Sequence, residues 1–177
     1  MKRFLTCLFA VGVLGVMGSL ATAGASEKSE VRIEKEARHE LRTLPYYGVF
    51  DNLTYQVKGD RVVLAGQVTQ PTLKTAAEKA VKSIEGVDKV DNTIEVLPLS
   101  DQDDRIRLAA YQSIYAHPAL SRYGLNAVLP IHIIVKNGDV ELIGFVSTEL
   151  DRNLAGAQVN SVAGVHSVKN SIVVSKG

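Results

Sequence analysis

Apolar residues recur at every fourth position in two stretches of the chain, and this spacing is typical of one buried helical face. The positions are Ile33, Ala37 and Leu41 in the first stretch and Ile106, Ala110 and Ile114 in the second. Each stretch is followed by a proline, Pro45 or Pro118. Because helices usually end before a proline, the pattern predicts one helix in front of each.

Two runs rich in β-branched and aliphatic residues follow each predicted helix, with a glycine-containing turn between them. The runs cover residues 53–58 and 61–68 in the first half of the chain and 131–136 and 139–146 in the second. Asn137-Gly138, between the later two runs, is the strongest two-residue hairpin signal. We therefore predict one β-hairpin in each half.

A helical spacing of apolar residues returns after each hairpin. The positions are Leu73, Ala77, Val81 and Ile84 in the first half and Leu150, Leu154 and Val159 in the second. Thr148 and Asp151 have the spacing of a capping box at the start of the later helix. Gly86 and Gly164 are predicted to end the two helices as C-caps.

The two halves of the chain are copies of one unit. Residues 57–96 align with residues 135–174 at an offset of 78 without a gap, and the offset upstream is 73, so the second copy has five extra residues before its first strand. A last strand is predicted in each copy, over 87–96 and 165–174. The predicted fold class is α+β, with two repeated α-β-β-α-β modules, each with two helices packed on one face of a small three-stranded mixed sheet.

The first 23 residues have the pattern of a cleaved secretory signal peptide. Lys2 and Arg3 precede an apolar run, which ends in Ala21-Thr22-Ala23. A membrane anchor is the alternative, but the apolar run is shorter than the roughly 20 residues that span a bilayer. We therefore expect export and cleavage near Ala23. The predicted domains are then a signal peptide at 1–23, a first module at 24–97, a linker at 98–102 and a second module at 103–177.

Charge and residue types argue against several classes of function. The formal net charge is +1, and removal of Lys2 and Arg3 leaves 18 basic and 19 acidic residues, whereas a nucleic-acid-binding protein is expected to carry a basic excess. Cys7, the only cysteine, lies in the predicted leader, so no disulfide is expected. RNA binding by a KH-like unit is also rejected as a function, because the exported part has no G-x-x-G loop.

No arrangement of residues predicts an active site or a metal centre. The histidines are widely separated, at His39, His117, His132 and His166. No nucleophile elbow, phosphate-binding loop or dinucleotide fingerprint occurs after the leader. Asp101, Asp103 and Asp104 lack the spacing of a calcium loop and are expected to stabilise a helix N-terminus instead. We predict no catalytic residues, no metal, no cofactor and no small-molecule substrate.

The strand sequence V-K-N-G-D-V-E-L-I-G-F-V from Val135 to Val146, followed later by Gly164-Val165, resembles the BON domain, the bacterial osmotically inducible and nodulation domain. The first copy has V-K-G-D-R-V-V-L-A-G-Q-V over 57–68 and then Gly86-Val87. The two copies cover nearly all of the chain after the leader. The leader and the tandem copies together are similar to the double-BON periplasmic stress proteins.

This resemblance implies a periplasmic, non-catalytic protein that binds phospholipid surfaces and supports envelope integrity under osmotic stress. The alternative is a protein-interaction adaptor that docks an outer-membrane or cell-wall partner. The family glycine falls at Gly66 and Gly144, and a glycine inside a strand favours a packing role over a ligand contact. Gly86 and Gly164 are likewise expected to be structural.

The extra residues of the second copy lie within 119–130, which reads A-L-S-R-Y-G-L-N-A-V-L-P and is unusually apolar for a connection. Two interpretations remain open. The apolar side chains fill the seam between the modules, or Leu120, Arg122, Tyr123 and Leu125 form a shallow lipid contact. The second interpretation rests on the preference of tyrosine for the headgroup level and on the pairing of arginine with phosphate.

Overall fold

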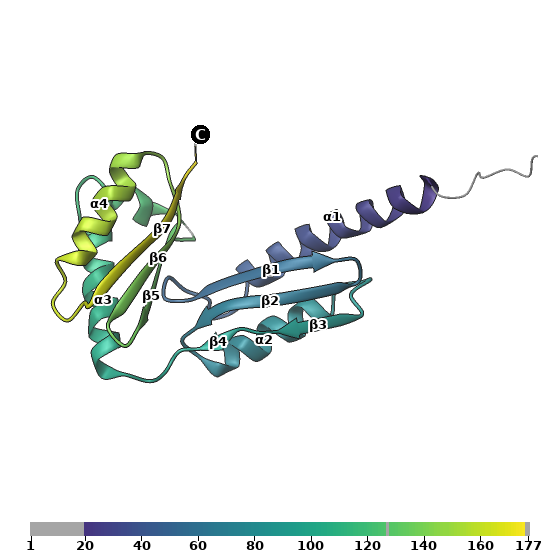
Figure 1. The fold of residues 1–177 in the computed structure, drawn as a ribbon, viewed down its shortest axis with the longest axis horizontal. Coiled ribbons are helices and arrows are strands. Elements are labelled where there is room, and N and C mark those ends of the chain that lie inside the picture. The colour runs from purple at the N-terminus through teal and green to yellow at the C-terminus, as the bar shows by residue number, and fades with distance from the viewer. Residues whose placement is uncertain (1–19, 127, 176–177) are drawn as a thin grey trace, which may run out of the picture.

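The computed structural model describes residues 20–126 and 128–175, which form two modules joined end to end (Figure 1). Most of the predicted leader, residues 1–19, lies outside this part of the chain. Within the described residues, no helix combines the length and the apolar character needed to cross a bilayer. The predicted α+β fold with two repeated modules is confirmed.

The first module follows the predicted order of elements. These are α1 (Leu20–Arg42), β1 (Asn52–Lys58), β2 (Arg61–Val68), α2 (Pro71–Lys82), β3 (Lys89–Asn92) and β4 (Glu95–Val96). The strand β2 is central, antiparallel to β1 and parallel to β3 and β4. The single last strand that we predicted is interrupted at Thr93, whose N–H and hydroxyl both donate to the carbonyl of Leu64, at 2.8 and 2.7 Å.

The second module repeats this arrangement. Its elements are α3 (Asp101–Tyr115), the short 3-10 helix η1 (Ser121–Leu125), β5 (Ile131–Lys136), β6 (Asp139–Val146), α4 (Glu149–Asn160) and β7 (Ser167–Val174). The strand β6 is central, antiparallel to β5 and parallel to β7 over its whole length. The extra residues of this copy contain η1.

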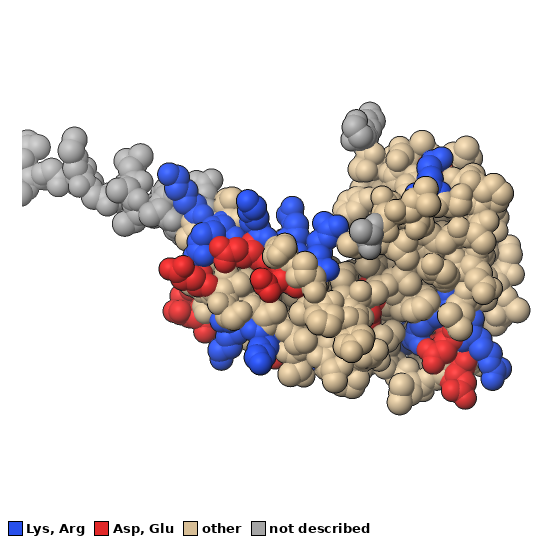
Figure 2. Space-filling view, turned by 180° about the vertical axis from the view of Figure 1, so that it is seen from behind, with Lys and Arg blue, Asp and Glu red and all other residues tan. Residues whose placement is uncertain are grey.

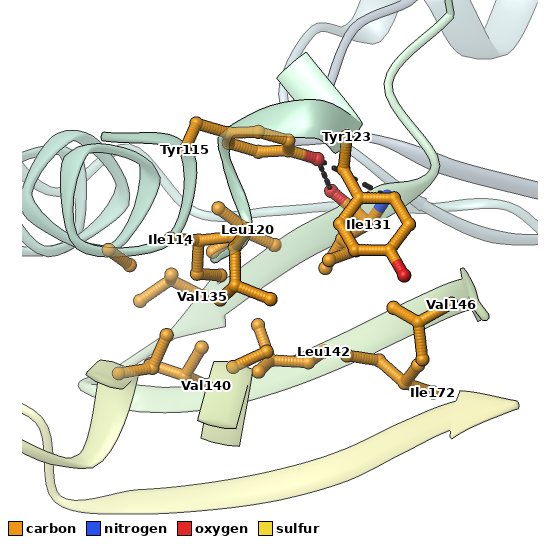
Figure 3. Packing of buried hydrophobic residues seen from close by; sticks show 14 of the residues in the cluster. Ile114, Tyr115, Leu120, Tyr123, Ile131, Val135, Val140, Leu142, Val146 and Ile172 are labelled. Atoms are coloured by element: carbon orange, nitrogen blue, oxygen red, sulfur yellow. Dashed lines mark hydrogen bonds between the residues drawn. The ribbon is translucent and has the colours of Figure 1, made fainter. Parts of the chain in front are cut away.

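Each module has its own hydrophobic core between its sheet and its two helices. The predicted helical faces are buried, because Ile33, Ala37 and Leu41 are at most 3% exposed and their counterparts on α3 at most 2%. Figure 3 shows the second core, where the Tyr115 hydroxyl donates to the Ile131 carbonyl at 2.7 Å and accepts from its N–H at 3.2 Å. The phenol therefore fixes the start of β5 to the end of α3.

The ends of α2 and α4 correct one prediction. Both helices end three or four residues before the glycines, and Ser83 and Ser161 are their C-caps. Gly86 and Gly164, with φ of 83° and 89°, lie instead in the turns that lead into the last strands. A type II turn needs a positive φ at its third residue, and glycine adopts it without strain.

The N-termini of α3 and α4 are capped by side chains. Thr148 accepts a hydrogen bond from the Asp151 N–H at 3.1 Å, as its spacing predicted. Ser100 accepts from the Asp103 N–H at 3.2 Å. The acidic residues therefore lie in the first turn of α3, where carboxylates favour the positive end of the helix dipole.

One of these carboxylates also holds the hairpin of its module. The buried Asp103 accepts from the N–H groups of Asn137 and Gly138, both at 2.9 Å. At the equivalent place in the first module, Glu30 accepts from the Gly59 N–H at 2.7 Å. Both modules therefore tie the first helix to the hairpin turn through one carboxylate.

Candidate functional site

The two modules meet where the segment after α1 reaches β5. The carbonyl of Val49 accepts from the Ile133 N–H at 2.8 Å, and the Tyr47 ring stacks on His132 with centroids 5.6 Å apart. Ile134, on the face of the second sheet that its helices do not cover, is only 5% exposed. The first module thus covers part of that face.

A groove of about 710 Å³ lies beside these contacts, between the modules. This volume is in the range of about 300 to 1,000 Å³ that is typical of ligand sites. Its apolar lining comes from both modules and includes Leu41, Leu53, Val128, Ile143, Phe145 and Val173. Phe145 and Val173, on the uncovered face of the second sheet, are 59% and 54% exposed.

The charge of the groove is positive. Arg38 and Arg42 of α1 line it, and no acidic side chain does. Among the described residues, neither arginine takes part in an ion pair. The Nε of Arg38 donates to the Tyr55 hydroxyl at 3.2 Å, and this bond raises the pKa of the guanidinium. The arginines therefore present positive charge to an apolar space, and the carboxylate that acts on Arg38, that of Glu34, lies outside the lining.

These arginines belong to a longer row of cations on α1. Lys28, Lys35, Arg38 and Arg42 are exposed and spaced by three, four or seven residues, which places them on one side of the helix. We call these four residues the basic stripe. Val31, which is 62% exposed, lies three residues after Lys28 and four before Lys35, so it is on the same side of the helix. Figure 2 shows a row of lysines and arginines along the first module that reaches the notch between the modules.

The imidazole of His132 lies in the wall of the groove. Burial lowers its pKa, against the opposing influence of the backbone at Asp51 and Gly48. Within the described part of the chain, its buried Nδ1 has no hydrogen-bond partner. The ring is therefore held neutral at the contact between the modules.

A second, smaller hollow of about 280 Å³ lies on the other side of the same seam. Lys136 pairs there with Glu95 of the first module at 2.6 Å, and Lys169 pairs with Glu141 at 2.8 Å. Because both lysines are paired and Asp139 adds a further carboxylate to the lining, this hollow attracts an anion less than the groove does.

The family glycines lie at equivalent positions of the two central strands. Gly66 pairs with Leu53 and Gly144 pairs with Ile131, both with a positive φ. A side chain at either position would collide with the backbone at the start of the neighbouring strand, at Asn52 for Gly66 and at Pro130 for Gly144. Each glycine thus lies where two backbones approach each other closely.

The four residues of the expected lipid contact do not form one surface. Leu120 is fully buried and Tyr123 is 7% exposed, and both pack in the core of the second module. The expectation of a lipid contact is corrected for these two side chains. Val49 and Phe50 of the first module pack against the same core, so a role of Leu120 at the seam stays a prediction. Arg122 is exposed and paired with Asp151, and Leu125 is 88% exposed. A lipid contact through Arg122 and Leu125 remains a prediction.

The extra residues have a structural role that the sequence did not suggest. In the first module, the Asp51 carboxylate accepts from the Thr69 N–H at 2.7 Å. The equivalent N–H in the second module, that of Ser147, donates to the Tyr123 hydroxyl at 2.8 Å, and this hydroxyl donates to Asp151 at 2.9 Å. Tyr123 thus replaces Asp51 as the acceptor at the end of the central strand.

Sequence reasoning did not identify the groove. One signal was present in the run Leu142-Ile143-Gly144-Phe145-Val146, which has apolar residues on both faces of β6. A strand with only one covered face would alternate apolar and polar residues. A second signal was the spacing of the cations between Lys28 and Arg42 on a predicted helix. Neither signal shows that the two surfaces adjoin.

Comparison with solved structures finds low-similarity matches. The C-terminal domain of CdsD, the structural protein of the type III secretion system of Chlamydia trachomatis, is 14% identical, with 80% of this chain and 96% of that chain covered and a TM-score of 0.28. A second structure of CdsD from the same organism is 13% identical, with coverages of 81% and 92% and a TM-score of 0.30. A comparison with curated proteins finds no match.

Within the described residues, no group of three or more histidine, cysteine, aspartate or glutamate side chains could hold a metal ion. The model of the BON domain matches the sequence twice, at residues 29–98 and 103–176. The two matches coincide with the two modules and together cover most of the chain. The chain therefore belongs to the BON domain family and carries two copies of the domain in tandem.

Proposed function

We propose that this protein binds anionic phospholipid surfaces at the bacterial cell envelope and acts there without catalysis. The observation that carries the proposal is the basic stripe of α1, which runs into a groove with exposed Phe145 and Val173 at its wall. Family membership supports it, because BON domains are associated with phospholipid binding and with envelope proteins and are generally non-catalytic. The leader pattern at 1–23 supports export to the periplasm.

The physical basis of this binding is local. Each lysine or arginine close to an anionic membrane contributes about 1 kcal/mol, and the attraction acts over roughly 8 Å at physiological salt. The formal net charge of +1 gives the molecule little long-range attraction. Four cations on one helix face can nevertheless approach the same surface together, and exposed apolar side chains beside them add hydrophobic burial.

Co-sedimentation with vesicles tests the proposal. The purified protein is mixed with vesicles of phosphatidylcholine alone or with phosphatidylglycerol added. We expect sedimentation only with the anionic vesicles and its loss in added salt. The variant Arg38→Glu with Arg42→Glu should lose most of the binding, because it reverses half of the basic stripe.

The matched control is Lys79→Glu with Lys82→Glu, which makes the same change in net charge on exposed residues of α2. This control should sediment like the unchanged protein. Equal loss of binding in both variants would contradict a role for the stripe. Capture of an outer-membrane protein from envelope extract, without vesicle binding, would favour the adaptor over the lipid-binding protein.

A further inference from the structure

We propose that the groove between the modules holds one acyl chain of an anionic lipid, with the anionic headgroup against Arg38 and Arg42. This inference rests on the proposed binding of lipid surfaces and names the part of the lipid that one site would take. It concerns a single lipid molecule rather than the charge of a surface, and it can therefore be tested without a membrane.

The lining of the groove has an apolar and a cationic part, with the neutral polar side chains of Asn52, Thr54 and Ser171 beside them. Ile143, Phe145 and Val173 come from the uncovered face of the second sheet, and Leu53 comes from β1 opposite. This apolar surface is formed by both modules, so neither module alone has the groove. Burial of an acyl chain there removes apolar surface from water on both sides, at about 25 cal/mol per Å².

The cationic part selects the headgroup. The hydrogen bond from Arg38 Nε to the Tyr55 hydroxyl orients that guanidinium, and Arg42 lies one helical turn further along α1. Neither side chain is neutralised by a carboxylate in the lining. Guanidinium groups bind phosphate through paired charge-assisted hydrogen bonds, so a phosphate or a carboxylate is the complementary group.

An acyl chain fits this site better than a peptide does. A peptide carries backbone N–H and C=O groups that need partners, and burying them unpaired against the wall of Ile143, Phe145 and Val173 costs free energy. The Val49 carbonyl is already occupied by the Ile133 N–H. A hydrocarbon chain has no polar group to satisfy, and its charged end lies where the arginines are.

The absence of tryptophan from the sequence allows a direct test. In the variant Phe145→Trp, the introduced indole is the only one and lies in the wall of the groove. The probe is a lysophosphatidylglycerol with bromine atoms in the middle of its one acyl chain, used below its micelle concentration. Bromine quenches an indole only at close range. We expect saturable quenching, which the unbrominated lipid does not produce.

The variant Leu150→Trp is the matched control, because Leu150 is 75% exposed on α4 and does not line the groove. Its indole should not be quenched. Adding Arg38→Glu and Arg42→Glu to Phe145→Trp should weaken binding of the lipid at least about tenfold, since two charge-assisted contacts are lost. Glycerol 3-phosphate, which lacks the chain, should not compete.

Two results would overturn the proposal. One is no quenching of Phe145→Trp at monomeric lipid concentrations, and the other is equal quenching in Leu150→Trp. If vesicle binding persists while the groove shows no quenching, the surface function stands and the acyl-chain site is wrong. The inference also fails if an apolar peptide displaces a fluorescent ligand from the groove and the brominated lipid does not. The occupant is then a peptide.

Discussion

At the residue scale, a glycine occupies the central strand of each module because the neighbouring backbone passes directly over it. A Cβ on Gly66 would lie 2.0 Å from the Asn52 carbonyl oxygen, and one on Gly144 would lie 1.8 Å from that of Pro130. The φ angles of 113° and 139° add backbone strain for any other residue. The sequence pattern favoured packing at these positions, but the contact itself is a backbone approach across the hairpin.

Substitution of this glycine should be costly. We expect Gly66→Ala to lower the free energy of unfolding by about 3 kcal/mol, from the steric collision and the unfavourable φ together. Gly59→Ala is the control, because Gly59 has a φ of 63° but no atom within 4 Å of the added carbon. It should cost about 1 kcal/mol. Urea unfolding compares the two, and equal losses would contradict a steric role for Gly66.

The carboxylate of Asp103 is a second residue with a measurable role. Asp103→Ala leaves the N–H groups of Asn137 and Gly138 without their acceptor, and we expect a loss of about 2 to 4 kcal/mol of stability. Asp101→Ala removes an exposed carboxylate from the same turn and should cost less than about 1 kcal/mol. If thermal unfolding shows the same loss for both, Asp103 acts only on the helix dipole.

At the element scale, hydrophobic spacing located the helices because each one buries a single face, and runs of β-branched and aliphatic residues beside turn signals located the strands. The 3.6-residue period of Ile33, Ala37 and Leu41 and the strand runs around Asn137-Gly138 depend on local sequence alone. The C-caps were placed wrongly, because a glycine in the following turn gives the same signal as a C-cap. The fold of the extra segment could not be predicted, because it is held by contacts of Tyr123 with Ser147 and Asp151, far along the chain.

The hydroxyl of Tyr123 should therefore stabilise the second module. Burial alone would raise the pKa of Asp151, but hydrogen bonds from Thr148 and Tyr123 and the charge of Arg122 lower it. Tyr123→Phe leaves the Ser147 N–H without an acceptor and should cost about 1 to 3 kcal/mol in urea unfolding. Tyr46→Phe, at a side chain that is 82% exposed, should change nothing. An unchanged Tyr123→Phe variant would mean that water replaces the hydroxyl.

At the scale of the whole molecule, the packing of the two modules against each other could not be predicted from the sequence. The repeat gives two equivalent units, but the seam consists of residues that the units do not share, such as Tyr47 on His132. Surface complementarity between modules leaves no periodic signal in a single sequence. The basic stripe and the apolar residues Phe145 and Val173 can each be recognised in the sequence. Only the fold shows that they lie at one groove.

The seam should weaken in mild acid. Because burial lowers the pKa of His132 below its value of about 6.5 in the unfolded chain, folding favours the neutral ring. The unfolded chain then binds more protons, and stability is lost as pH falls from about 6.5 toward the lowered pKa. Two charged groups act on this ring: the carboxylate of Asp51 raises the pKa of His132, and the guanidinium of Arg42 lowers it.

The measurement is the unfolding free energy at about pH 7.5 and about pH 5 for the unchanged protein and for His132→Phe, which keeps a ring against Tyr47. The variant should lose less stability on acidification. His39→Phe, at an exposed position of α1, is the control and should lose as much as the unchanged protein. The same acid loss in all three proteins would show that His132 does not titrate with folding.

The central claim is that α1 faces the lipid surface, and a fluorescent label placed on this helix tests it most directly. In a Cys7→Ser background, a polarity-sensitive dye is attached to Val31→Cys on the stripe side of α1, to Leu125→Cys in the extra segment, or to Thr75→Cys on α2. With phosphatidylglycerol vesicles, we predict a shift to shorter wavelength for the label at position 31 and none at position 75. A shift at position 125 without one at position 31, or no shift at any position, would contradict this account.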